Sequence, residues 1–403
     1  MLAPNHYFPP FSLEEYRRRY SVLSDAMKEA GLDCLVIYGA TPLGGNDTGQ
    51  INAQYLSNFA GVGHTYVVFP VKEVPTLHIG MALHIQNAQD ISPIQDVRGG
   101  IELEATVSGR LKELSLDKGN IGIVGPGVSF FMPCTLPYEH YTRLLKDFPG
   151  AQFQNVSEWY ENIRSMKSDE EIALIERAAA LNDLCHEEMF HATRPGMSHA
   201  DLRRIVEQVA FMHKGNHCMM HLSSWPMSNQ DWPYPDFWPT DHTVEAGHMV
   251  MSEMPVGYGM YYTKLMGTYF LGDPTREYRD MFELAALVHE RVIREFKPGM
   301  RGSDVDKFVE PLKEAGYMAS GLVSGWCNYN SPPFVGQTHP GFPLKTKQSH
   351  LDLVFKPGLC VQVMAYPIAP GFKKGLWVGS TCVFTKDGLR ELNKYPVRKL
   401  RVA

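Results

Sequence analysis

A short segment that occurs twice in the chain constrains its fold more than any other feature of the sequence. Residues 194–201 and residues 297–304 each start with a basic side chain, continue with Pro-Gly-Met and end on an aspartate. Each copy follows one helical pattern and precedes another. Since the copies are too far apart for the repeats of a solenoid, they predict an internally duplicated α/β unit with a pseudo-twofold axis.

The chain has 403 residues, more than a single hydrophobic core usually organises, so we expect two domains. Over residues 1–160, helical patterns alternate with apolar, β-branched runs, which is typical of an α/β domain. Ser168 and Glu171 then have the spacing of a capping box in front of a long helical pattern, so we assign residues 161–403 to a second domain. The elements expected in the first domain are helices at 12–30 and 103–114 and strands at 34–38, 66–69, 76–79 and 121–124.

Four apolar runs in the second domain predict antiparallel strands. Gly257 and Gly259 lie where the first two runs would turn back on each other as a hairpin. A sheet of this kind, with helices on one face, leaves its other face free to carry a functional site. The four runs are residues 248–255, 259–271, 358–366 and 376–384.

The composition excludes several classes of function. With 20% charged residues and a formal charge of -6, the chain has no basic excess, so we expect no nucleic-acid partner. The sequence contains no signal-peptide pattern and no long uninterrupted apolar run, which disfavours export and a membrane partner. The seven cysteines form no C-x-x-C pair, which indicates reduced thiols and a cytoplasmic protein.

Three segments carry a resemblance to a known family. Residues 164–179 are similar to the linker-helix motif that opens the C-terminal domain of creatinases, aminopeptidase P and prolidases. Residues 259–272 resemble the strand motif of that family, and residues 356–359 resemble its x-P-G-M turn. By the order and spacing of these motifs, the chain is identified as a member of the creatinase/aminopeptidase P superfamily. The resemblance implies an α/β N-terminal domain followed by an α+β pita-bread domain, and commonly a homodimer.

The resemblance also locates the positions that hold two divalent ions in the metallopeptidases of the family. The first aspartate ligand is matched by Glu253 and the second by Lys264, whose ammonium cannot ligate a metal while protonated. Because Glu253 alone keeps a carboxylate, we expect no metal and no other cofactor. The remaining ligands are matched by residues 328–330, by Gln362, and by Gly379 or Ser380.

Three residues are our candidates for catalysis: Lys264, Glu253 and His339. Glu253 and Lys264 lie in the two arms of one predicted hairpin, so they can face each other. They are either a structural ion pair in place of the metal charge, or a site in which Lys264 binds an anionic substrate or transfers protons. His339 resembles the second histidine of the family, although a histidine in a loop can also be a plain surface residue. His217 and His221 are weaker candidates, since each can simply fill the core.

Candidates for substrate binding come from an aromatic-rich stretch and from the matched positions. The histidine of creatinase is matched by Tyr234, or by Asp236 if two residues are inserted, and the glutamates that bind creatine are matched by Met266 and Gln362. Creatine is therefore not the expected substrate. The aromatic stretch predicts a pocket for an apolar or aromatic group, or else a rigid loop packed on the core. The substrate-binding candidates are Tyr234, Asp236, Tyr262, Asn330, Gln362 and Trp377.

These residues lead to a prediction about function. Polar and charged groups at the former ligand positions indicate a reworked pocket, so we predict a metal-independent enzyme that hydrolyses a C–N bond of a small molecule. One alternative is a lyase that cleaves a C–C or C–O bond of an aromatic substrate, with Lys264 as base or Schiff-base amine. Another alternative is a non-catalytic protein that keeps the pita-bread fold.

Overall fold

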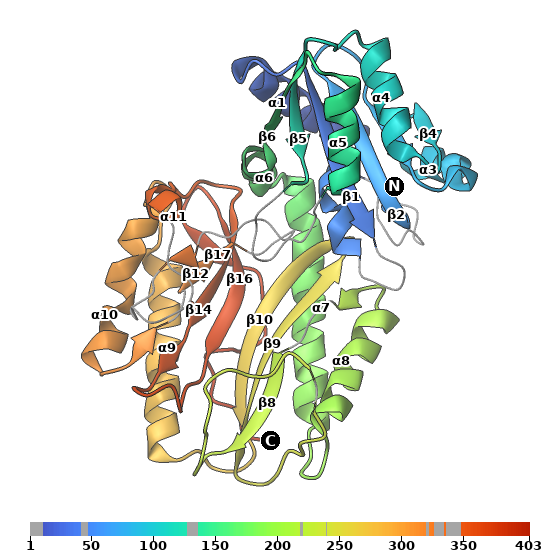
Figure 1. Cartoon of the computed structure of the whole chain (residues 1–403). Coiled ribbons are helices and arrows are strands. Elements are labelled where there is room, and N and C mark those ends of the chain that lie inside the picture. Colours follow the sequence, from blue (N-terminus) through green and yellow to red (C-terminus); the bar gives the residue numbers. More distant parts are fainter. Residues whose placement is uncertain are drawn as a thin grey trace. The chain divides into compact units, whose positions relative to one another are not determined.

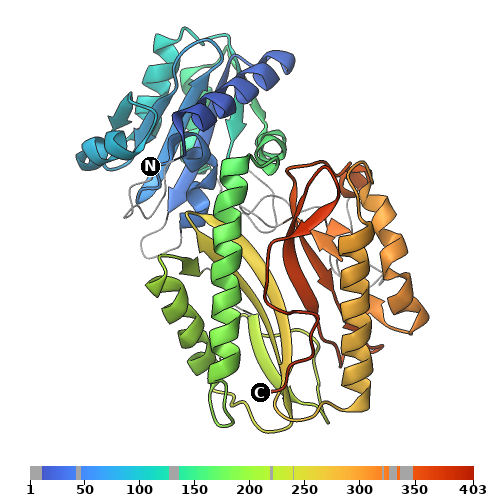
Figure 2. The same ribbon diagram turned by 180° about the vertical axis from the view of Figure 1, so that it is seen from behind.

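The computed structural model of the chain (Figures 1 and 2) describes residues 11–41, 47–126, 136–217, 221–238, 240–319, 322–325, 334–335 and 348–403. These residues form two units, each compact by itself, which divide after Arg164. Among the described helices, none is both long and apolar enough to cross a membrane.

The first unit contains six strands in one sheet: β1 (Cys34–Thr41), β2 (Gly63–Pro70), β3 (Thr76–Ile79), β4 (Val97–Gly99), β5 (Asn120–Val124) and β6 (Gln152–Asn155). The strand order is β4-β3-β2-β1-β5-β6, and β1 pairs antiparallel with β2 but parallel with β5. Alternate residues of β1 enter two separate apolar clusters, so both faces of this sheet are buried. The helices are α1 (Leu13–Glu29), α2 (Ile51–Ser57), α3 (Ile85–Ile91), α4 (Leu103–Glu113), α5 (Tyr138–Asp147) and α6 (Ser157–Ser165).

The α/β pattern expected for the first unit is confirmed. The predicted strands lie within β1, β2, β3 and β5, and the predicted helices coincide with α1 and α4. The Ser12 hydroxyl accepts a hydrogen bond from the N–H of Glu15 at 3.0 Å, so α1 begins at the predicted cap.

The second unit contains two helix pairs of the same kind: α7 (Asp169–Ala192) with α8 (His199–Met212), and α9 (Arg276–Glu295) with α10 (Asp306–Glu314). The predicted capping box starts α7, because Ser168 and Glu171 bond each other's backbone N–H. One copy of the Pro-Gly-Met segment follows the first helix of each pair. Gly196 and Gly299 both have a φ of +90°, which glycine adopts without strain. The chain therefore makes the same turn at both copies.

The longer strands of the second unit join one sheet with the order β13-β12-β14-β16-β10-β9-β7, while β8 pairs with β9 and β17 with β16. The helices α7 and α9 lie behind these strands in Figure 1 and in front of them in Figure 2, so the helices cover one face. The strands are β7 (Asn216–His217), β8 (His221–Pro226), β9 (His248–Tyr258), β10 (Tyr261–Phe270), β12 (Val323–Ser324), β13 (Phe334–Val335), β14 (Cys360–Ala365), β16 (Val378–Phe384) and β17 (Leu389–Glu391). The remaining elements are β11 (Met318–Ala319), β15 (Pro367–Ile368) and α11 (Gln348–Asp352), with short 3-10 turns at Asp47–Gln50, Ala82–His84 and Gly302–Val305.

The predicted hairpin is formed by β9 and β10, which turn at Gly259 and Met260, both with positive φ. Glu253 lies opposite Met266, and Lys264 lies opposite Pro255. Thr263 contacts Asn182 of α7, so the next side chain along β10, Lys264, points to the face that the helices do not cover. The register therefore brings Glu253 and Lys264 to the same open face.

Candidate functional site

Glu253 and Lys264 form an ion pair on this open face, from Nζ of Lys264 to Oε1 of Glu253. Their side chains are 9% and 11% exposed, so the pair is largely removed from water but can still be reached. Burial raises the pKa of Glu253, but the charge of Lys264 and the imidazole of His221 outweigh burial, and the pKa lies below its ordinary value. The site therefore holds one carboxylate and one ammonium side by side.

His221 of β8 is a third polar residue of the site, which the sequence marked only as a weak candidate. It pairs in register with Glu253 on the neighbouring strand, so both side chains lie on the same face. The ring centroids of His221 and Phe237 are 4.2 Å apart. Its Nε2 atom is buried and has no hydrogen-bond partner in the described part of the chain. The pairing of β8 with β9 reveals this residue, and no local motif does.

Aromatic rings line the site next to the ion pair. Tyr366 packs edge-on against Trp377 and against Tyr234, with ring centroids 5.1 Å apart in both contacts. The Tyr366 hydroxyl donates to the carbonyl of Pro233, and burial raises its pKa well above the ordinary value. Nε1 of Trp377 donates to the carbonyl of Ser252 at 3.1 Å. Tyr366 and Trp377 thus stabilise the wall, whereas the partly exposed Tyr234 is the ring that a ligand can reach.

Two further candidate residues lie on the same face of the sheet. Gln362 is buried, and its Oε1 accepts a hydrogen bond of 3.2 Å from the Thr381 hydroxyl. That hydroxyl also accepts the backbone N–H of Lys264 at 2.9 Å, so Gln362 and Lys264 are linked through one threonine. Tyr262 is fully buried and bonds the side-chain amide of Asn216. Both residues support the site from within the fold.

Gly379 and Ser380, the two matches for the last glutamate ligand of the family, point to opposite faces. Gly379 pairs with Met266 on the open face, where a Cβ atom would lie 2.9 Å from the carbonyl oxygen of Val363. Ser380 points to the helices, where its Oγ donates to Glu391 at 2.6 Å and contacts Nε2 of His289 at 3.0 Å. Neither position offers a carboxylate to the site.

Asp236 lies in an open cleft of about 750 Å³ beside β8 that Tyr234 also lines. The Asp236 carboxylate accepts a hydrogen bond from the Ser223 hydroxyl at 3.1 Å. The backbone N–H of Asp236 donates to the Ser223 hydroxyl oxygen at 3.0 Å. Asp236 is therefore an exposed residue that holds the local loop. Two other candidates, His339 and Asn330, lie outside the described residues.

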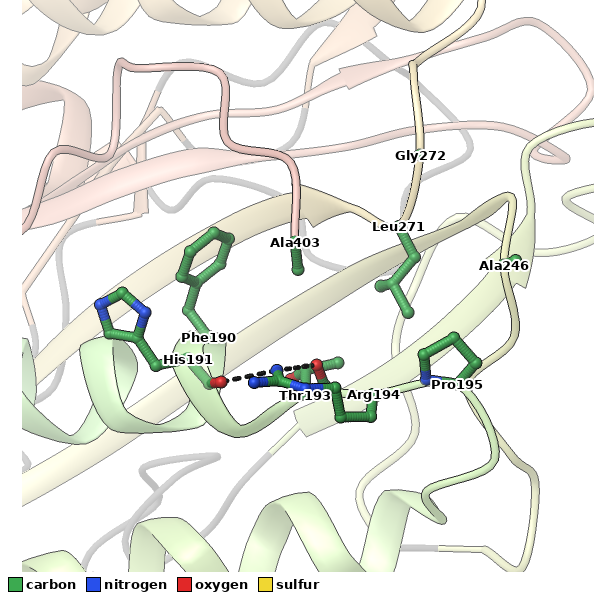
Figure 3. A pocket seen from close by; sticks show the side chains of 9 residues that line it. All are labelled: Phe190, His191, Thr193, Arg194, Pro195, Ala246, Leu271, Gly272 and Ala403. Atoms are coloured by element: carbon green, nitrogen blue, oxygen red, sulfur yellow. Dashed lines mark hydrogen bonds between the residues drawn. The ribbon is translucent and has the colours of Figure 1, made fainter.

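A second pocket, of about 560 Å³, lies near the end of β10 around Leu271 and the end of α7 (Figure 3). Arg194 is the basic residue of its lining, and its guanidinium donates to the carbonyl oxygens of His191 and Thr193 at 2.7 Å each. The Arg194 side chain therefore caps the C-terminal end of α7. The pocket contains none of the residues proposed for catalysis or substrate binding.

Comparison with known proteins identifies both units. The creatinase/prolidase N-terminal domain matches residues 19–166, and metallopeptidase family M24 matches residues 173–386. The chain is 26% identical over 259 residues to the Xaa-Pro dipeptidase of Lactobacillus helveticus, which covers 63% of this chain and 67% of that protein. It is 23% identical over 348 residues to the Xaa-Pro dipeptidase of Lactobacillus delbrueckii subsp. lactis. This match covers 83% of this chain and 89% of that protein.

Solved structures share the fold at low sequence identity. The Xaa-Pro dipeptidase from Bacillus anthracis superimposes with a TM-score of 0.75 at 20% identity, over 96% of this chain and all of that one. The X-Pro aminopeptidase from Thermotoga maritima MSB8 superimposes with a TM-score of 0.76 at 17% identity, over 96% and 99% of the two chains. The chain thus has an α/β domain followed in sequence by the pita-bread fold of the creatinase/aminopeptidase P superfamily. It belongs to metallopeptidase family M24.

These comparisons contradict our functional prediction. The matched relatives carry the names of peptidases, so a metal-independent, non-peptidase hydrolase of a small molecule is the wrong assignment. The lyase alternative fails on the same finding, and the non-catalytic alternative stays a prediction. The error came from treating changed ligand positions as evidence for a changed reaction, although single positions do not define a substrate class.

Membership of a metallopeptidase family implies a pair of divalent ions, so the residues present can be tested against that requirement. Over the described ranges, no three His, Cys, Asp or Glu side chains gather closely enough to hold a metal ion. The carboxylate of Glu253 already faces the Lys264 ammonium, and two cations at one carboxylate repel each other. Gly379 and Ser380 supply no further ligand. The described residues therefore do not fit a two-metal centre at the matched positions.

Proposed function

We propose that this chain recognises short peptides of the Xaa-Pro class at the open face around Glu253 and Lys264. The proposal is supported by membership of family M24 and by relatives that are named Xaa-Pro dipeptidases. The observation that carries it is the nearly buried pair of opposite charges beside a partly exposed aromatic ring.

The charges of the site complement those of a dipeptide. At neutral pH a dipeptide has an ammonium group at one end and a carboxylate at the other. Glu253 can accept hydrogen bonds from the ammonium, and Lys264 can donate to a ligand oxygen, so the ligand takes over part of the existing pair. Because the pair is largely shielded from water, each such bond is stronger than it would be at an exposed position.

The aromatic wall suits the proline side of such a peptide. A proline ring is compact and apolar, and it carries no amide N–H that would need a partner in the peptide bond. Tyr234 presents a partly exposed ring beside Tyr366, and the ring of Phe237 packs on His221 with centroids 4.2 Å apart. A proline packed against the Tyr234 ring would bury apolar surface without leaving a polar group unpaired.

Calorimetric titration of the purified chain with the dipeptide Ala-Pro tests the proposal. We expect Ala-Pro to bind, and we expect N-acetyl-Ala-Pro, which lacks the ammonium, to bind at least about tenfold more weakly, as does Ala-prolinamide, which lacks the carboxylate. Loss of binding in Glu253→Gln and Lys264→Met, each shown to be folded by circular dichroism, would support the assigned contacts. A wild-type chain that binds none of these peptides would refute the proposal, and proline release in the same samples shows whether the bound peptide is cleaved.

A further inference from the structure

We infer that His221 is a third ligand-binding residue of this site and that its Nε2–H donates a hydrogen bond to an oxygen of the bound peptide. This inference rests on the proposed function. Its structural basis is the position of His221, which pairs in register with Glu253 and therefore lies beside the ion pair on the open face.

The imidazole of His221 is not fully hydrogen-bonded in the described part of the chain. Nε2 of His221 is buried and has no hydrogen-bond partner in the described part of the chain. A buried polar atom without a partner destabilises the folded state, because it has lost its bonds to water. Folded proteins rarely retain such an atom without a use for it, and ligand binding is one such use.

A dipeptide offers more hydrogen-bond acceptors than donors to this site. A dipeptide has one ammonium group but two oxygen-bearing groups, the peptide carbonyl and the terminal carboxylate. The ion pair offers one carboxylate, from Glu253, and one ammonium, from Lys264. One N–H of Lys264 already faces Glu253, so a second donor beside the pair allows the two oxygen-bearing groups to be bound from two directions. A neutral imidazole with its proton on Nε2 supplies that donor without adding a second cation beside Lys264.

The imidazole ring of His221 is covered by an aromatic neighbour, Phe237. The ring of Phe237 packs on His221 with centroids 4.2 Å apart, which orients the imidazole. The Phe237 side chain is itself 56% exposed, so few contacts hold it in place. Phe237 is therefore the group that an entering peptide would displace to reach Nε2.

Two variants separate the hydrogen bond from the shape of the ring. His221→Phe keeps a planar ring against Phe237 but removes the N–H, and we expect it to weaken Ala-Pro binding about tenfold. His221→Gln retains an N–H donor near the position of Nε2, and we expect its affinity to stay within about threefold of the wild type. His213→Gln, at an exposed histidine after α8, is the control and should bind as the wild type does.

Nitrogen-15 NMR of the histidine side chains provides the closing test on the wild-type chain, with the His221 signals assigned by their loss in His221→Phe. We expect the tautomer with the proton on Nε2, and a shift of that nitrogen when Ala-Pro is added. If Ala-Pro binds while the His221 signals stay unchanged, or if His221→Phe binds as tightly as the wild type, the inference falls and the proposed function stands. If Ala-Pro does not bind the wild type, both fall.

Discussion

Glu253 and Lys264 are diagonal neighbours across the β9–β10 hairpin, and their opposite charges meet in a setting that is about nine-tenths shielded from water. Breaking a buried pair by removing one partner leaves the other charge without compensation. We therefore expect Lys264→Met to lower the free energy of unfolding by about 3–5 kcal/mol, measured by urea denaturation at pH 7.

The double variant Glu253→Gln with Lys264→Met is the control for this prediction. It removes both charges and fills a similar volume, so it should be clearly more stable than Lys264→Met alone. Equal stabilities of the single and double variants would mean that the two charges do not interact in the folded chain.

The close packing around Gly379 is a second point of sensitivity. A Cβ atom there would lie 2.9 Å from the carbonyl oxygen of Val363 and 3.1 Å from the sulfur of Met266. The carbonyl belongs to the backbone of β14 and cannot simply rotate away. We expect Gly379→Ala to destabilise the chain by about 1–3 kcal/mol in urea denaturation.

Gly109 in α4 is the matched control for that substitution, because no other atom lies within 4 Å of a Cβ added there. An alanine inside a helix is favoured over glycine, so Gly109→Ala should stabilise the chain by about 0.5–1 kcal/mol. A stabilising effect of the same size at Gly379 would show that β14 and β16 can separate freely.

The pH dependence of stability has a defined contribution from His289. Burial is the main reason that its pKa falls to about 4, with Glu391 raising the pKa and Arg398 lowering it. Arg398 donates to Nδ1 at 2.9 Å, so a proton on that nitrogen would lose this bond. With an ordinary pKa of 6.5, the unfolded chain binds more protons than the folded one between pH 6.5 and 4.

The contribution of His289 to the free energy of unfolding is therefore fully present above about pH 6.5 and is lost as the pH falls toward 4. Its size is on the order of 3 kcal/mol. We expect His289→Gln to show a shallower decrease of unfolding free energy than the wild type over pH 7 to 4.5, measured by urea denaturation at each pH. Parallel curves for the two proteins would mean that His289 does not titrate differently on folding.

The capping box at the start of α7 is also joined to the sheet that carries the site. The N–H of Glu171 donates to the Ser168 hydroxyl at 3.2 Å, and Oε1 of Glu171 accepts the Tyr261 hydroxyl of β10 at 2.9 Å. We expect Ser168→Ala to cost about 1 kcal/mol and Glu171→Ala to cost more, because it also leaves a buried tyrosine hydroxyl without its acceptor. Ser21→Ala, at an exposed residue of α1, should change stability by less than about 0.5 kcal/mol, and an equal loss in all three variants would contradict the role of the box.

Local features of the sequence were sufficient for most of the fold. The capping box of Ser168 and Glu171 and the hairpin between β9 and β10 were predicted, because their contacts join residues close together in the chain. The predicted β10 run started two residues too early, since Gly259 and Met260 form the turn itself. The superfamily was also evident from the spacing of its motifs, and the M24 match confirms it.

The amino-acid sequence by itself thus determined the elements, the superfamily and the loss of carboxylates at the matched ligand positions. The tertiary structure decided which side chains meet: that Lys264 touches Glu253, that His221 joins them, and that Ser380 turns away to His289. The reason is the two-residue period of a strand, in which a shift of one residue in pairing sends a side chain to the other face. That register depends on strands that are distant in the chain, so only the folded sheet specifies the site.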